Sequence, residues 1–94
     1  MNAKQISPAA NAIQRRVLKV IDDLIRTKRM GSLSSWCEGH DLNRVKYSNL
    51  RSSYMTGSSS AKYKIIDVDV LTYLVQDFGV SASWLITGSG NEYT

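Results

Sequence analysis

The chain has 94 residues, of which 43% are hydrophobic and 21% are charged, and its formal net charge is +4. This length suffices for one small domain and excludes a large two-domain enzyme, while the single cysteine, Cys37, excludes an intrachain disulfide scaffold and fits a reducing, intracellular setting. No apolar run reaches about 18 residues and residues 1–10 contain no apolar segment, so neither a membrane span nor a signal peptide is expected.

The first predicted helix begins at Ser7-Pro8. A serine hydroxyl can accept from the free N–H groups of a first turn, and proline at the first helical position loses no needed donor. Gly31 is expected to end this helix, because glycine tolerates a left-handed backbone. Apolar residues recur with a helical period between these ends. They are Ile13, Val17, Val20, Ile21, Leu24, Ile25 and the stem of Lys28. The opposite face is expected to be solvated and holds Arg15, Arg16 and Lys19.

Two shorter helices are predicted next, each opened by a capping residue. Ser32 caps the first and Asn43 caps the second. The apolar and aromatic stripe of the first contains Leu33, Trp36, Cys37 and His40. The second carries Arg44, Tyr47, Leu50 and Tyr54 at helical spacing. The run Gly57–Ser60 then indicates a loop.

Two more helices complete the chain. Asp67 is expected to cap the fourth helix, which Gly79 ends, and Ser81 is expected to cap a short fifth helix. The inward side chains are expected to be Leu71, Leu74, Val75, Phe78 and Trp84. No run favours a sheet, so the sequence predicts five short helices and an all-α fold.

Positive charge is concentrated in the first two thirds of the chain. Residues 1–65 hold all 12 basic residues and four acids, a net 12 − 4 = +8, whereas residues 66–94 hold four acids and no base. Between Leu42 and Ile66 there are five basic residues and no acid. This asymmetry favours a polyanionic partner on one face, with an ordinary solvated face as the alternative.

The second and third helices are close enough in sequence to form a helix-turn-helix motif. The motif needs a small residue where the helices cross, a turn residue that tolerates positive φ, and apolar residues beneath an exposed second helix. With Gly39 in the turn, Ser34, His40 and Ser48 would be buried without partners. With Asp41 in the turn, Cys37 becomes the crossing residue and apolar side chains fill the interior, so this register is favoured.

The order of these segments resembles a known family. The chain resembles the Cro/repressor-type helix-turn-helix domain of temperate bacteriophages in three successive segments. These are Ser32–Leu50, Asp67–Phe78 and the closing run Gly-Val-Ser-Ala-Ser-Trp-Leu-Ile-Thr-Gly at 79–88. The closing run is similar to the ending of the phage CI-repressor subfamily. The chain departs from the family pattern at Cys37 and Asp41, where the family usually has Ala and Gly.

The resemblance implies an all-α, five-helix, lambda-repressor-like DNA-binding domain over residues 11–88. Residues 1–10 would form an N-terminal arm and helix start, and residues 89–94 are expected to be a flexible tail or linker. It further implies a cytoplasmic, nucleoid-associated transcriptional regulator of bacterial or phage origin. The third helix, about residues 43–54, would enter the major groove of double-stranded DNA, and a homodimer would bind a palindromic operator.

The resemblance also implies which residues meet the ligand. Side chains that suit base edges are Arg44, Val45, Ser48 and Asn49. Residues expected to hold phosphates are Ser32, Ser34, Lys46, Arg51, Lys62, Tyr63 and Lys64. Two apolar residues of the fifth helix, Leu85 and Ile86, are expected at the centre of the dimer interface.

Other chemistry finds little support in the sequence. Cys37 and His40 are too few for a structural zinc site, and Asp67 and Asp69 have no evident catalytic partner. No metal, cofactor, small-molecule substrate or enzymatic activity is therefore expected. The alternative function is a protein-binding adaptor or antitoxin-like module on the same fold, which would have no need of the excess positive charge.

Overall fold

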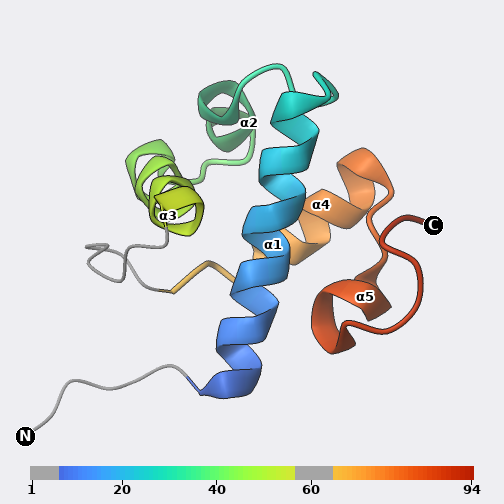
Figure 1. Cartoon of the computed structure of the whole chain (residues 1–94). Coiled ribbons are helices and arrows are strands. Elements are labelled where there is room, and N and C mark those ends of the chain that lie inside the picture. Colours follow the sequence, from blue (N-terminus) through green and yellow to red (C-terminus); the bar gives the residue numbers. More distant parts are fainter. Residues whose placement is uncertain (1–6, 57–64) are drawn as a thin grey trace, which may run out of the picture.

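The computed structural model describes residues 7–56 and 65–94. These residues form five helices and no β-strand, which confirms the all-α class. The helices are α1 (Pro8–Arg26), α2 (Leu33–Gly39), α3 (Arg44–Thr56), α4 (Asp69–Phe78) and α5 (Ala82–Thr87). In Figure 1, α1 runs through the middle, with α2 and α3 on one side of it and α5 on the other. Within the described residues, no helix is both long and apolar enough to cross a membrane.

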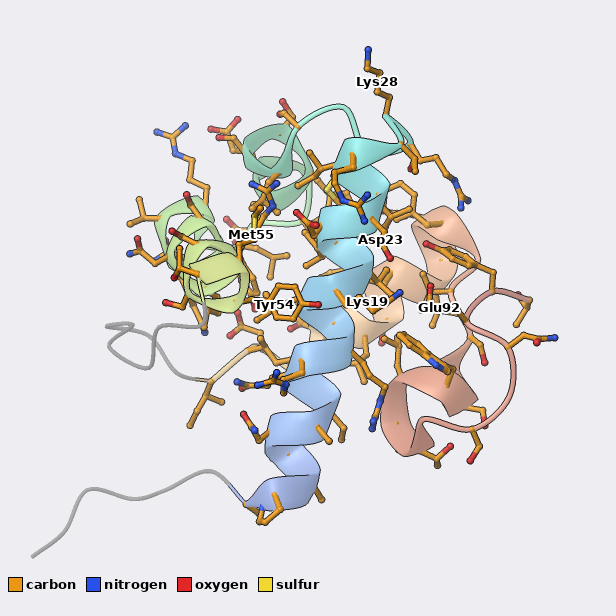
Figure 2. The ribbon with its side chains drawn as sticks, in the orientation of Figure 1. Lys19, Asp23, Lys28, Tyr54, Met55 and Glu92 are labelled. Carbon is orange, nitrogen blue, oxygen red and sulfur yellow. The ribbon has the colours of Figure 1, made fainter. Side chains whose placement is uncertain are left out.

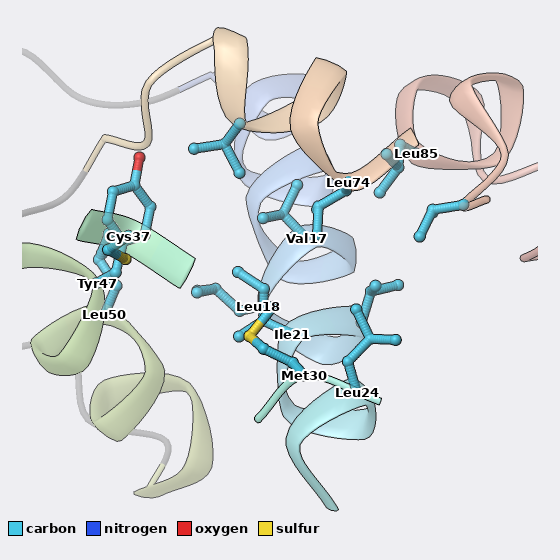
Figure 3. Packing of buried hydrophobic residues seen from close by; sticks show 13 residues of the cluster. Val17, Leu18, Ile21, Leu24, Met30, Cys37, Tyr47, Leu50, Leu74 and Leu85 are labelled. Carbon is cyan, nitrogen blue, oxygen red and sulfur yellow. The ribbon is translucent and has the colours of Figure 1, made fainter. Parts of the chain in front are cut away.

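The core is built around α1. Its residues Val17, Val20, Ile21 and Leu24 are fully buried, because the helical period places them on one stripe. Figure 3 shows how side chains from the other elements pack against that stripe. These include Met30, Cys37, Tyr47, Leu50, Val70, Leu74, Val80 and Leu85. Burial of this kind is the main source of stability in a domain of this size.

Helix α1 begins as predicted and ends earlier than predicted. The Ser7 hydroxyl accepts from the Ala10 N–H at 3.1 Å. The helix ends at Arg26, and the left-handed residue after it is Lys28 (φ 64°), not Gly31. Among the hydrogen bonds that close this end, the Lys28 N–H donates to the Ile25 carbonyl (3.1 Å) and the Arg29 N–H donates to the Leu24 carbonyl (2.9 Å).

The early end of α1 changes which side chain faces inward. Lys28 projects into solvent (Figure 2), so its stem does not join the apolar stripe. Met30, which is 2% exposed, is buried against the core instead.

The start of α4 also differs from the prediction. Helix α4 begins at Asp69, and Val68 occupies the capping position without a side-chain hydrogen bond. Asp67 is not a cap, because its carboxylate is bound by residues of α3, as described below. The later boundaries are confirmed: Gly79 ends α4 with φ 69°, and the Ser81 hydroxyl accepts from the Trp84 N–H.

Residues 89–94 are not the expected free tail. The chain turns back so that Val80 and Tyr93 form an isolated antiparallel bridge. The Ser81 N–H donates to the Glu92 carbonyl and the Thr94 N–H donates to the Gly79 carbonyl, each at 2.9 Å. These bonds join residues that are close in space but lie outside the helices. The helical periodicity of the sequence therefore does not predict them.

Two cations expected to be solvated on α1 instead fix the C-terminal elements. Lys19 donates to Asp23 at 2.9 Å and to Glu92 at 2.6 Å (Figure 2). The hydrogen bond to Glu92 is the largest of the causes that raise the pKa of Lys19. Arg16 donates to the carbonyls of Leu85 and Ile86, both at 2.9 Å, and so satisfies free acceptors at the end of α5. Arg15 remains exposed, as expected.

The position of Leu85 corrects the expected dimer interface. Its side chain is fully buried in the core of the single chain, so it has no surface to offer a second copy. Ile86 is 53% exposed and stays accessible. Adjacent helical residues face different directions, and here one faces the core and the next faces solvent.

Candidate nucleic-acid interface

The turn between α2 and α3 follows the register that places Asp41 in the turn. Asp41 adopts φ 58°, whereas Gly39 is the last residue of α2 and is not left-handed. Cys37 is fully buried beneath the turn, and burial raises the pKa of its thiol to about 11, so the thiol packs as a neutral group at pH 7. Its carbonyl accepts from the Leu42 N–H at 2.7 Å, which closes the turn.

The start of α3 is fixed by a side-chain cap. The Asn43 Oδ1 accepts from the Lys46 N–H at 3.0 Å, so the capping role predicted for Asn43 is confirmed. The same holds at the start of α2, where the Ser32 hydroxyl accepts from the Ser35 N–H at 3.0 Å. Both helices therefore have well-defined first turns.

Helix α3 presents two chemically different faces. Tyr47 (0% exposed) and Leu50 (4% exposed) pack against the core. The opposite face is exposed and holds the residues expected at base edges, Arg44, Val45, Ser48 and Asn49. Val45 is 56% exposed, so an apolar side chain lies open to solvent among polar ones.

The exposed face of α3 is hollowed where it meets the start of α2. The groove has a volume of about 360 Å³. It is lined by Leu33, Ser34, Arg44, Val45, Ser48, Asn49 and Arg51. Residues of α2 and α3 therefore line one shallow groove. A ligand that contacts both helices, as expected from the sequence, needs such a shared surface.

The three cations of α3 have acidic partners, which sequence analysis did not anticipate. Arg44 pairs with Glu38 at 2.8 Å, Lys46 with Asp67 at 3.3 Å, and Arg51 with Asp22 at 2.9 Å. The positive charge between Leu42 and Ile66 is therefore compensated at each of the described basic positions. The excess positive charge of this segment therefore gives less support to a polyanionic partner than the sequence alone suggests.

These pairs differ in how easily a ligand could replace them. The side chains of Arg44 and Glu38 are 59% and 61% exposed, and a pair so open to water contributes less than about 1 kcal/mol. Lys46 is 17% exposed and Arg51 is 29% exposed. Arg44 can therefore exchange Glu38 for a ligand more readily, whereas Lys46 and Arg51 are mostly buried in their ion pairs and are less available for their expected phosphate role.

Asp22 explains the position of Arg51. This carboxylate lies at the edge of the buried face of α1 and accepts from Arg26 and twice from Arg51. Burial alone would raise the pKa of Asp22, but the hydrogen bonds from Arg26 and Arg51 outweigh it and lower the pKa. Arg51 thus ties α3 to α1. The sequence contains one hint of this contact: Asp22 follows Leu18 by four residues, so both lie on the same face of the helix. An acid that is partly buried on that face needs a cationic partner.

Tyr47 and Asp67 fix α3 to the segment before α4. The Tyr47 hydroxyl donates to Asp67 Oδ2 at 2.6 Å and accepts from the Asp67 N–H at 2.8 Å. The hydrogen bond from Tyr47 is the main cause that lowers the pKa of Asp67, while burial raises the pKa of the Tyr47 phenol. A buried tyrosine needs a polar partner, and that requirement is the only hint of this contact in the sequence.

The candidate metal pair Cys37 and His40 does not converge. Cys37 is buried, whereas the His40 ring stacks on Tyr73 with centroids 3.9 Å apart and its Nε2 lies 2.6 Å from Asp77 Oδ2. In the described part of the chain, no three His, Cys, Asp or Glu side chains are grouped to hold a metal ion.

The remaining expected phosphate contacts are only partly described. Ser32 and Ser34 are exposed at the start of α2, whereas Lys62, Tyr63 and Lys64 lie outside the described residues. The chain matches no protein-family model, no curated protein and no solved structure.

Proposed function

We propose that the protein is a sequence-specific regulator of transcription that binds double-stranded DNA, with α2 and α3 as a lambda-repressor-like helix-turn-helix. The observation that carries this proposal is the two-sided character of α3. Its buried side is fixed to the core by Tyr47 and Leu50, and its open side gathers Val45, Ser48 and Asn49 beside the start of α2. A rigid helix with an exposed, mixed polar face is what major-groove recognition requires.

The exposed side chains match the chemistry of base edges. The Asn49 amide can bind adenine through two hydrogen bonds, and Val45 can contact a thymine methyl group. Arg44 can bind guanine after leaving Glu38, because a bidentate contact is worth about 1–3 kcal/mol and the exposed ion pair less than about 1 kcal/mol. Ser48 can serve either as donor or as acceptor.

Phosphate contacts are assigned more narrowly than the sequence alone suggests. Ser32 and Ser34 are exposed beside α3, and Lys62 and Lys64 retain their assignment from sequence. Lys46 and Arg51 are left out, because both are paired with carboxylates and, unlike Arg44, are mostly buried. These contacts would orient the domain, and the face of α3 would select the sequence.

The proposal includes a homodimer on a palindromic operator. One helix reads too few base pairs for operator specificity, and two copies about 34 Å apart would meet successive major-groove turns. Ile86 is the exposed apolar residue of α5 that can contribute to such a contact, whereas Leu85 cannot. Neither a cofactor nor a catalytic step belongs to the proposal.

The proposal is tested by binding to a duplex of random sequence over a salt series. Two subunits that each place Lys62 and Lys64 on phosphates release about four counterions, so the log–log slope of affinity against salt should be roughly −3 to −4. A slope near zero would overturn the DNA proposal.

The alternative, a protein-binding adaptor, is favoured by one observation. Arg44, Lys46 and Arg51 are neutralised within the chain, which leaves the exposed face of α3 close to neutral. A neutral groove whose lining includes the exposed Val45 also suits a peptide segment. Binding to a protein partner with no affinity for duplex at low salt would support this alternative.

A further inference from the structure

One ion pair engages a cation of α3, the helix that the proposed function places in the major groove. Lys46 lies in the first turn of α3, next in sequence to Val45, and its ammonium lies 3.3 Å from Asp67 Oδ2. The ammonium also lies 5.6 Å from the centroid of the Tyr47 ring. We propose that Asp67 acts as an internal substitute for a DNA phosphate, which holds Lys46 away from the backbone and limits non-specific binding.

The hydrogen bonds of Asp67 make this pairing persistent. Its carboxylate and its backbone N–H are both bonded to the hydroxyl of the buried Tyr47, so its position is fixed from two sides. The side chain of Lys46 is 17% exposed, while that of Asp67 is 43% exposed. The carboxylate is therefore the more exposed partner of the pair, and the ammonium is the more enclosed one.

The Arg44–Glu38 ion pair, in contrast, contains a cation that a ligand can displace from its partner. Arg44 and Glu38 are each more than half exposed, and neither is held by a buried group. A phosphate or base can compete for Arg44 from open solvent. The difference between the two pairs would let the site use Arg44 in a sequence-dependent contact and keep Lys46 out of sequence-independent ones.

The substitution Asp67→Asn separates the charge from the structural role. The amide oxygen of asparagine can still accept from the Tyr47 hydroxyl, and the backbone N–H of residue 67 is unchanged. The attraction for Lys46 is lost, and the hydrogen bond from Tyr47 becomes one between neutral groups. Asp69→Asn is the matched control, because it changes the net charge equally and the Asp69 carboxylate accepts from the Tyr73 hydroxyl.

The inference rests on the proposed function and is tested by the salt dependence of binding to a random duplex. Asp67→Asn should make the log–log slope steeper by about one unit per subunit, because each Lys46 gains a phosphate. Asp69→Asn should leave the slope unchanged. Lys46→Met should have no effect on the slope of the wild-type chain and should abolish the gain in the Asp67→Asn background.

The outcomes distinguish failure of the inference from failure of the proposed function. Equal slopes for the Asp67→Asn and Asp69→Asn variants would overturn the inference, and so would a flatter slope for Lys46→Met alone. Either result leaves DNA binding itself intact. If the wild-type chain binds no duplex at low salt, the proposed function fails and the inference fails with it.

Discussion

The imidazole of His40 and the indole of Trp36 share one carboxylate oxygen of Asp77. His40 Nε2 lies 2.6 Å from Asp77 Oδ2, and Trp36 Nε1 donates to the same atom at 2.8 Å. The two aromatic residues belong to the C-terminal half of α2 and its cap, whereas Asp77 belongs to α4. This contact ties the end of α2, just before the left-handed Asp41, to α4.

The first prediction concerns the pH dependence of this contact. The hydrogen bond with His40 is the main cause that lowers the pKa of Asp77 below its ordinary value of 3.8. A carboxyl group with a lowered folded-state pKa stabilises the fold above the unfolded-state value, and that stabilisation is lost as the pH falls. Asp77→Asn should lower the free energy of unfolding at pH 6 by about 0.5–1 kcal/mol. Urea unfolding at several pH values should show the difference shrinking below pH 3.8. A difference independent of pH would contradict it.

A second prediction separates the two apolar residues of α5. Leu85→Ala should lower the free energy of unfolding by about 2–5 kcal/mol, because it opens a cavity in the core. Ile86→Ala, at an exposed position, should change it by no more than about 0.5 kcal/mol. Urea denaturation of both variants measures this. Equal effects would show that Leu85 is not a core residue.

A third prediction tests the turn between α2 and α3. Gly39→Ala should stabilise the fold by about 0.5–1 kcal/mol, because Gly39 is helical and an added Cβ would meet nothing within 4 Å. Asp41→Ala should destabilise it by up to about 1 kcal/mol, because alanine tolerates a left-handed backbone less well than aspartate. Thermal unfolding of the pair should move in opposite directions. Destabilisation by Gly39→Ala would indicate the other register.

Features set by local rules were predictable from the sequence. The caps Ser7, Ser32, Asn43 and Ser81 are confirmed, and so is the left-handed end of α4 at Gly79. Each depends on a residue and its neighbours within one helical turn.

Features set by partners distant in sequence were not predictable. The Asp67 carboxylate binds the Tyr47 hydroxyl and therefore does not cap α4. Residues 92–94 fold back onto the segment that begins at Gly79. The cations of α3 appear free in sequence because their partners Asp22 and Asp67 lie outside that helix. The exposed face of α3 was predicted, whereas its charge balance depends on tertiary contacts that periodicity does not encode.

The most direct test of the central claim uses Asn49 on the exposed face of α3. A site is first selected from a random duplex library, and affinities are then measured for the selected and a scrambled duplex, with the wild-type chain and Asn49→Ala. Gln76→Ala, at an exposed position on α4, is the control. The account predicts that Asn49→Ala loses about 1–3 kcal/mol on the selected duplex, keeps its affinity for the scrambled one, and relaxes preference at one base pair in each half-site. Equal weakening on both duplexes, or no change on either, would contradict the claim that this face reads base sequence.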